Sequence, residues 1–297
     1  MAQQFSNEPL SGLLTAATWL LLLVTIRCAA PGARLGPLLA SGLALGWALL
    51  AKVTVVLLLP AWCVCLVFVV GRATATPLQA VLRCARALAA VLGVAVLVAG
   101  WYYARNWWEL GSPFIGGWDP ARGFRWWQDP GYRNAAQFLS FGESLTYPVF
   151  ASLVSVWDAF YSTFWLDGNQ SGVSPGEQPP WNWSFALAGA WWGVVPSLGL
   201  FAGCGVAASR FLRRGDATAL FLLGSLASYG GAMLYFSFTV PVYSAQKAHY
   251  ALGLLPCITL LMLLGFDLFW RWRFARACIV GWVSATVSCG YCAYFIL

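Results

Sequence analysis

Charged residues are what this sequence lacks most. Only 9% of its 297 residues are charged, whereas 60% are hydrophobic. A soluble domain carries about 25% charged residues, so a soluble enzyme and a disordered chain are both excluded. The 17 basic residues outnumber the 10 acidic ones. They lie between apolar runs, however, and not in one patch with interleaved aromatics, which argues against nucleic acid as a partner.

Histidine is nearly absent as well, because His249 is the only one in the chain. Two cysteine pairs have metal-like spacing, Cys63-x-Cys65 and Cys289-x-x-Cys292, but apolar sequence surrounds both. We interpret these cysteines as small buried hydrophobes. The sequence therefore identifies no metal ligands and no cofactor, and it leaves a divalent metal requirement open.

Long apolar runs are what the sequence has in abundance. About 20 apolar residues cross a hydrocarbon core about 30 Å thick. The runs predict an all-α, polytopic helical membrane protein with about 8 transmembrane segments and one aromatic-rich outward loop domain. The predicted segments are Leu10–Ile26, Gly36–Leu50, Val53–Val70, Ala87–Tyr103, Trp183–Ala208, Ala217–Val240, Tyr250–Trp270 and Ala277–Leu297. Lys52 separates the second from the third, which form either a tight hairpin or one broken helix.

The short turns between the segments carry most of the basic residues. With eight crossings, the turns that hold these arginines all fall on one side, which the positive-inside rule makes cytoplasmic. They are Arg27, Arg34, Arg72, Arg83, Arg86, Arg210, Arg213, Arg214, Arg271, Arg273 and Arg276. We expect an integral protein of the cytoplasmic (plasma) membrane with its N-terminus outside. Because no leading span precedes that end, we expect an odd number of N-terminal spans to be missing.

Three regions follow from this topology: N-terminal membrane spans at 1–103, an outward-facing loop domain at 104–182, and C-terminal membrane spans at 183–297. The loop domain is rich in tryptophan and in turn signals, and it holds most of the acidic residues. These are Glu109, Asp119, Asp129, Glu143, Asp158, Asp167 and Glu177. Its aromatics form either an interfacial belt with a packed cap or flat faces that bind sugar beside carboxylates, and both interpretations can hold together.

A few cations stand at the predicted outer boundary. Lys52 interrupts an apolar run, and Gln246-Lys-Ala-His-Tyr250 places Lys247, His249 and Tyr250 at the start of a span. Arg105 lies on the same predicted surface. A charge within a span costs several kcal/mol unless it snorkels or faces a polar cavity. These residues are therefore either anchors or fixed cations for an anionic head group, and the second interpretation predicts an outward cavity that receives an anion.

Four stretches carry a resemblance to a known family. They are Asn7-Glu-Pro-Leu10 at a helix start, the Gly-rich run from Gly42 to Lys52 continuing to Pro60, Gly100-Trp-Tyr-Tyr-Ala-Arg-Asn-Trp107 with Gly111-Ser-Pro113, and Gln246-Lys-Ala-His-Tyr250 with Leu255-Pro-Cys257. In order and spacing they resemble the later part of the GT-C-type membrane glycosyltransferases. This group includes bacterial aminoarabinose-transferase-like and protein-mannosyltransferase-like enzymes.

The resemblance implies transfer of a sugar from a polyprenyl-phosphate donor to a glycan, lipid or protein acceptor at the outer face of the membrane. It implies Glu8 as an active-site carboxylate, with Lys52, Arg105 and Lys247 on the phosphate side and His249 and Tyr250 beside them. These enzymes carry their principal acidic residue in a first outward loop, which this chain lacks, so we expect an incomplete enzyme. A transporter or flippase of an anionic lipid or solute, and a non-catalytic membrane partner, are the rival hypotheses.

Overall fold

The fold is described by a computed structural model, which covers residues 8–28, 35–114, 134–149, 151–166, 168, 183–239, 247–270 and 272–295. Every regular element in these ranges is helical. Six helical segments are long and apolar enough to cross a membrane, which marks the chain as a helical membrane protein. They are Pro9–Cys28, Val53–Ala73, Pro77–Leu110, Ser184–Arg214, Ala217–Phe238 and Tyr250–Asp267.

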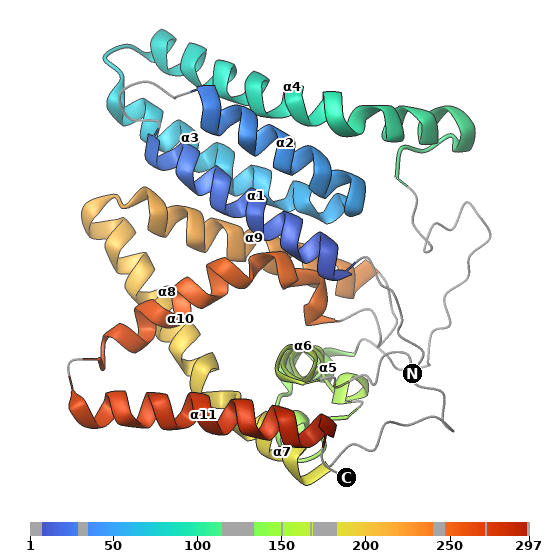
Figure 1. Cartoon of the computed structure of the whole chain (residues 1–297), viewed down its shortest axis with the longest axis vertical. Helices are drawn as coiled ribbons and strands as arrows, with labels where there is room; N and C mark the ends of the chain where they lie inside the picture. The colour runs from blue at the N-terminus through green and yellow to red at the C-terminus, as the bar shows by residue number, and fades with distance from the viewer. Residues whose placement is uncertain are drawn as a thin grey trace.

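The N-terminal helices form a layered group. It comprises α1 (Glu8–Cys28), α2 (Leu35–Ala51), the 3₁₀ helix η1 (Val53–Leu57), α3 (Leu58–Ala73) and α4 (Pro77–Leu110). Helix α2 lies between α1 and α4, while α3 packs on α9 (Figure 1). Lys52 has an extended backbone (φ −163°, ψ 132°) that ends α2. The chain then reverses into α3, so the junction is a hairpin (Figure 1).

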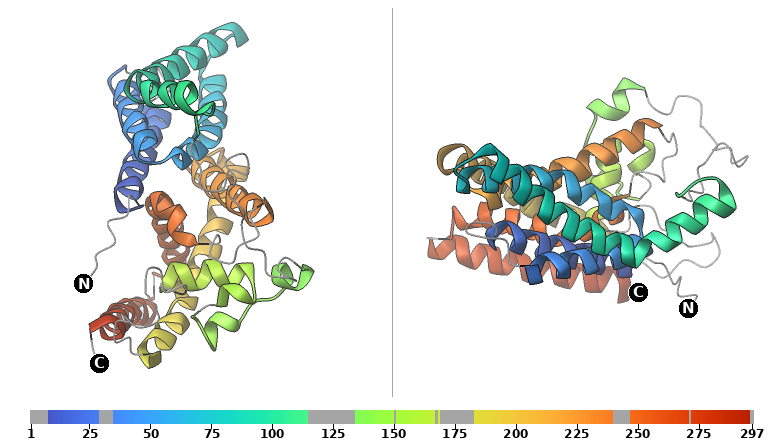
Figure 2. Two further views of the ribbon diagram at one scale, coloured as in Figure 1. Left: turned by 90° about the vertical axis from the view of Figure 1, so that its right-hand side faces the viewer. Right: turned by 90° about the horizontal axis from the view of Figure 1, so that it is seen from above.

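The C-terminal helices form a second, more open group. It comprises α7 (Trp183–Trp192), α8 (Val194–Arg214), α9 (Ala217–Thr239), the 3₁₀ helix η6 (Ala248–Leu254), α10 (Leu255–Asp267) and α11 (Arg273–Phe295). Helix α8 crosses α10, and α11 lies along α7 at the edge of the molecule farthest from α4 (Figure 2). Short elements precede this group: α5 (Ala135–Leu139), η3 (Glu143–Leu145), η4 (Ala151–Leu153) and α6 (Val156–Trp165).

Helix α1 buries several hydroxyl groups and exposes several leucines. Ser11, Thr15 and Thr18 are buried, whereas Leu13 and Leu20 are 67% and 47% exposed. A soluble surface helix turns its apolar stripe to the core and its polar face to water. Leucines on the outside and hydroxyls on the inside suit a helix whose solvent is lipid.

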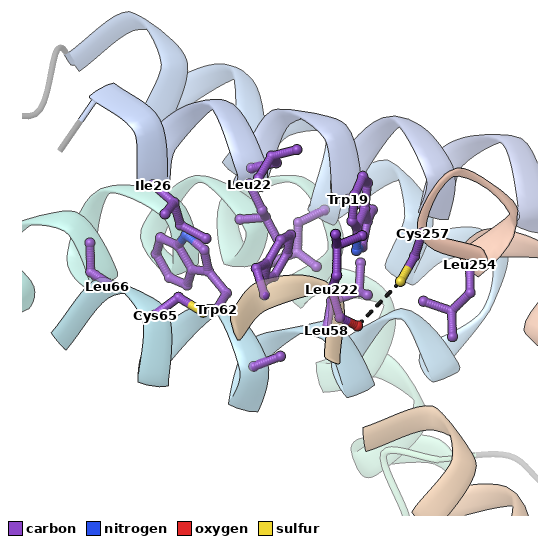
Figure 3. Packing of buried hydrophobic residues seen from close by; sticks show 14 of the residues in the cluster. Trp19, Leu22, Ile26, Leu58, Trp62, Cys65, Leu66, Leu222, Leu254 and Cys257 are labelled. Carbon is purple, nitrogen blue, oxygen red and sulfur yellow. Dashed lines mark hydrogen bonds between the residues drawn. The ribbon is translucent and has the colours of Figure 1, made fainter. Parts of the chain in front are cut away.

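The largest buried side chains form one cluster with members from α1, α2, α3, α9, η6 and α10, part of which Figure 3 shows. The Trp19 ring stacks on Phe221 with centroids 5.3 Å apart, and its Nε1 donates to Ser225 Oγ at 3.0 Å. Trp62 Nε1 donates to Thr25 Oγ1 at 2.9 Å. Since buried polar groups need partners, these two bonds fix α1 against α9 and α3.

Glycines set the distance at two helix crossings. A Cβ added at Gly42 would lie 2.7 Å from the Val91 carbonyl oxygen, and one at Gly46 would lie 2.6 Å from Val98 Cβ. At the second crossing, α8 meets α10 so closely that a Cβ at Gly203 would overlap the Leu261 carbonyl. Small residues four apart let membrane helices approach in this way. Packing therefore accounts for the Gly-rich run from Gly42 to Lys52 without a catalytic role.

Helix α4 is much longer than the span predicted within it. The Thr76 hydroxyl caps its start by accepting a bond from Gln79 N, Pro77 occupies the first turn, and Gly111 ends the helix at φ 71°. Its 34 residues extend about 51 Å at 1.5 Å per residue. The helix therefore extends past residue 103, where the N-terminal membrane spans were predicted to end, and continues to Leu110.

Candidate functional site

Several helix ends meet at the side of the molecule where α1 begins and α2 ends (Figure 1). Helix α1 packs on η6 in this region. A Cβ added at Gly12 would lie 3.0 Å from Leu252 Cβ, and one at Gly253 would overlap the Thr15 side chain. The two glycines thus bring the first turns of α1 and the turn of η6 into close contact.

Lys52 is the cation at the centre of this meeting point. Its backbone N–H donates to the Ala48 carbonyl at 2.8 Å and caps α2, and its half-buried side chain turns toward η6. The ammonium Nζ lies 4.3 Å from the centroid of the Tyr250 ring. A cation within about 6 Å of an aromatic face is attracted by the ring quadrupole, so this contact holds Lys52 in place.

Tyr250 is itself positioned by the fold of η6. Its N–H donates to the Lys247 carbonyl at 3.2 Å, and its ring meets Phe236 of α9 edge-on, with centroids 6.4 Å apart. The backbone N–H of Ala248 donates to Thr163 Oγ1 of α6 at 2.9 Å. Lys247 therefore stands one 3₁₀ turn before Tyr250, on a segment that α6 and α9 both hold.

Two predicted site residues are placed by their backbones alone. Glu8 is the first residue of α1, one turn before Gly12, and His249 lies between Ala248 and Tyr250 in η6. The side chains of both lie outside the described part of the structure. Their backbones nevertheless belong to the same meeting of α1 and η6 as Lys52 and Tyr250.

Arg105 stands apart from this group. It lies on the last turns of α4, where its Nε is 3.1 Å from Glu109 Oε2 and the two side chains are 59% and 51% exposed. Helix α4 touches the end of α2 two residues earlier, where Tyr103 Oη donates to the Leu49 carbonyl at 2.7 Å. An exposed i,i+4 pair is worth about 0.3–0.5 kcal/mol, so an anion could displace Glu109.

Asp158 is an acidic residue of the loop domain with a clear structural role. The carboxylate is fully buried on α6 and accepts backbone N–H bonds from Gly142 at 3.1 Å and Ser144 at 2.9 Å. The Ser155 hydroxyl caps the start of the same helix. Ser155-x-x-Asp158 is a helix-start signal, and the Asp158 carboxylate also fixes the preceding turn.

The sequence reasoning missed Phe236 and Thr163, which position Tyr250 and Ala248. Phe236 lies inside an ordinary apolar run, and Thr163 is an unremarkable polar residue of α6. Neither carried a local signal, because both contacts join segments that are distant in the chain.

Burial affects one ionisable group near α6. The Tyr161 hydroxyl donates to the Ala190 carbonyl at 2.5 Å, and burial raises the pKa of Tyr161 to about 12. The phenol therefore stays neutral at physiological pH, and it links α6 to α7 as a hydrogen-bond donor.

Within the described ranges, no group of three or more His, Cys, Asp or Glu side chains could hold a metal ion. Two cysteines bond to backbone instead. Cys65 Sγ lies 3.8 Å from the Ala217 carbonyl oxygen, and Cys257 Sγ lies 3.3 Å from that of Leu222 (Figure 3). The thiols that can be seen here behave as packed core groups.

Comparison of the chain with protein-family models, with curated proteins and with solved structures finds no match. The chemistry must therefore be argued from the site. Lys52 and Lys247 offer positive charge, Tyr250 offers an aromatic face, and all three lie where helices end at one side of the molecule.

Proposed function

We propose that the chain crosses the membrane eight times, with α2 and α11 added to the six long apolar segments. The turns after α1, α3, α8 and α10 then face the cytoplasm, and residues 104–182 lie outside. Support comes from the arrangement of the helices, because the C-terminal ends of α1, α3, α8 and α10 lie at one end of the molecule (Figure 1). Arg72, Arg213 and Arg273 lie at that end, as the positive-inside rule requires. The membrane that we propose is the cytoplasmic one.

We further propose that the chain is an integral membrane glycosyltransferase that uses a polyprenyl-phosphate-linked sugar. The observation that carries this proposal is the Lys52 ammonium, 4.3 Å from the Tyr250 ring, on the side opposite the arginine-rich turns. Lysine supplies a compact positive charge for phosphate, and the adjoining aromatic face suits a sugar ring. The resemblance noted above supplies the reaction class.

In this proposal each residue has one role. The acceptor O–H or N–H attacks the anomeric carbon, the bond from that carbon to the phosphate oxygen breaks, and the polyprenyl phosphate leaves with the electron pair. Lys52 and Lys247 stabilise the negative charge on the leaving phosphate. The Glu8 carboxylate accepts the acceptor's proton. His249 binds beside the phosphate. The resemblance adds Arg105, which stands apart on α4, as a further cation on the phosphate side.

Release of undecaprenyl phosphate from undecaprenyl-phosphate-linked mannose, glucose and aminoarabinose, with a lipid and glycan extract supplied as acceptor, tests this proposal. The full chain is purified into lipid nanodiscs, and the released carrier is quantified by mass spectrometry. We expect Lys52→Ala to lower release at least about tenfold, the value of one charge-assisted contact, and Lys52→Arg to retain part of it. Arg83→Gln, which removes a cation at the opposite side, is the matched control and should release carrier normally.

Three outcomes would contradict the proposal. Equal release of carrier by the unaltered chain and by Lys52→Ala would show that Lys52 does not bind the phosphate. Movement of undecaprenyl phosphate between leaflets of proteoliposomes, with no bond broken, would support the flippase instead. Neither release nor movement would support the non-catalytic partner.

A further inference from the structure

A cavity of about 510 Å³ lies at the arginine-rich end of the molecule, on the side opposite Lys52. The ends of α1, α8, α9 and α10 enclose it, and Ile279 of α11 closes one side. Small-molecule pockets in proteins have volumes of about 300–1,000 Å³. The cavity is thus large enough for a ligand and independent of the proposed transferase site.

Charges of both signs line the mouth of this cavity. Arg27 comes from the last turn of α1, Arg210 from the end of α8, Asp216 from the start of α9, and Asp267 ends α10. Among these four described residues, no ion pair joins an arginine to an aspartate. Both signs of charge therefore remain available to a ligand.

Thr218 fixes two of the charged groups. Arg27 Nε donates to Thr218 Oγ1 at 3.4 Å, and Asp216 Oδ1 accepts the Thr218 backbone N–H at 2.9 Å. Asp216 Oδ1 also accepts the N–H of Ala219 at 3.4 Å, so it caps α9. One cation and one anion are thereby held a short distance apart on the cavity wall.

The deeper wall is apolar. Leu260, Leu263 and Leu264 of α10 line it, together with Leu222 of α9. On α10 these leucines precede Asp267 by three to seven residues, or about 5–10 Å along the helix. The cavity therefore changes from charged at the helix ends to apolar toward the middle of the membrane, which is the polarity profile of an amphiphile.

We propose that this cavity binds a phospholipid whose head group carries both a phosphate and a primary ammonium. Arg27 and Arg210 bind the phosphate, since guanidinium groups match its oxygens in charge and geometry. Asp216 and Asp267 accept hydrogen bonds from the ammonium, and the leucines contact the first part of the acyl chains. A purely anionic lipid would meet two aspartates, which disfavour it by like charge. A soluble phosphate would leave the apolar wall uncovered.

Native mass spectrometry of the delipidated full chain tests this assignment. The chain is titrated with phosphatidylethanolamine, with phosphatidylcholine, whose ammonium has no N–H donor, and with phosphatidylglycerol, which has no ammonium. We expect phosphatidylethanolamine to bind most tightly. Arg210→Gln should weaken it about tenfold, the loss expected for one charge-assisted hydrogen bond. Asp267→Asn should reduce the preference for phosphatidylethanolamine over phosphatidylcholine.

Arg213→Gln is the matched control, because Arg213 lies on the same end of α8 but outside the cavity. Its phosphatidylethanolamine affinity should stay within about twofold of the unaltered chain, as expected for a screened surface charge. Arg27→Gln, on a different helix, repeats the test if Arg210→Gln loses its helical circular dichroism. Equal losses in Arg210→Gln and Arg213→Gln, or equal affinity for all three lipids, would overturn the proposal. Saturation by inorganic phosphate alone would do so too.

Discussion

Hydroxyl groups inside the helix bundle contribute unequally to its stability. Ser225 Oγ accepts the Trp19 indole N–H, whereas the hydroxyl of Tyr229, one turn later on α9, is buried and has no hydrogen-bond partner among the described residues. A buried polar group without a partner costs about 1–3 kcal/mol. Tyr229 should therefore destabilise the fold that Ser225 helps to hold.

Tyr229→Phe should raise the free energy of unfolding by about 1 kcal/mol, because it removes the unpaired hydroxyl and keeps the ring. Ser225→Ala should lower it by about 1 kcal/mol, because the Trp19 N–H then loses its acceptor. Equilibrium unfolding of the purified chain in mixed micelles, followed by circular dichroism, measures both changes. A loss of stability in Tyr229→Phe would show that the hydroxyl has a partner.

The distance between crossing helices depends on single glycines, and a neighbouring glycine outside the contact serves as the comparison. At the crossing of α8 and α10, a Cβ on Gly203 would overlap the Leu261 carbonyl and one on Gly265 would overlap the Gly199 carbonyl. Gly205, two residues along α8, has nothing within 4 Å of its Cβ position. The same substitution at Gly203 and at Gly205 therefore separates crossing geometry from helix propensity.

Gly203→Ala should destabilise the chain by about 1–3 kcal/mol, the usual cost of overpacking, because backbone lies on the far side of the contact. Gly205→Ala should be neutral or slightly stabilising, since alanine favours the helix. The thermal midpoint of each variant in one detergent gives the comparison. Similar midpoints for the two variants would mean that α8 and α10 can move apart to admit the Cβ of residue 203 without loss of stability.

The chain as a whole has two ends that differ in charge. Arginines gather where α3 turns into α4 and where α8 turns into α9, while Lys52, η6 and α6 lie at the other end (Figure 1). If the first end faces the cytoplasm, residues on α5 must be accessible from outside. Ala75, in the turn between α3 and α4, and Ala136 of α5 are exposed and represent the two ends.

Single cysteines introduced as Ala75→Cys and Ala136→Cys, in a chain whose native cysteines are replaced by alanine, test the orientation. A maleimide that does not cross membranes should label Ala136→Cys in intact cells. It should label Ala75→Cys only after permeabilisation, because the proposed topology places that turn inside. The reverse pattern would mean that the topology is inverted. Labelling of both positions in intact cells would mean that the chain does not cross the membrane between Ala75 and Ala136.

The bounds of a helix were predictable where a long apolar run covered the whole helix. They were less predictable where the helix continued into polar residues on either side of the run. For α9, the predicted Ala217–Val240 differs from the observed end at Thr239 by one residue. For α4, only Ala87–Tyr103 was predicted, because Arg83 and Arg86 at one end and Asn106 and Glu109 at the other break the apolar run. The Thr76-Pro77 start and Gly111 end were readable as caps.

Single residues of the site were predictable from the sequence, but the contacts between them were not. Lys52 and Tyr250 were each singled out because polar groups at a span boundary are costly. Their contact joins two distant parts of the chain, and it is set by the packing of α1 on η6 and by no local pattern. The predicted span Tyr250–Trp270 gave no sign that its first turns, as far as Leu254, form a 3₁₀ helix.

The length of α4 exceeds what one crossing of a membrane requires. Even at a tilt of about 40°, near the limit seen for membrane helices, its 34 residues rise about 39 Å, which exceeds a core of about 30 Å. The turns after Tyr103, which bonds to the end of α2, add about 10 Å of helix. Gly111 therefore ends an arm of helix that extends beyond the contact of Tyr103 with α2. Under the topology and the reaction proposed above, an acceptor held beyond this arm would approach the lipid-linked sugar from the aqueous side.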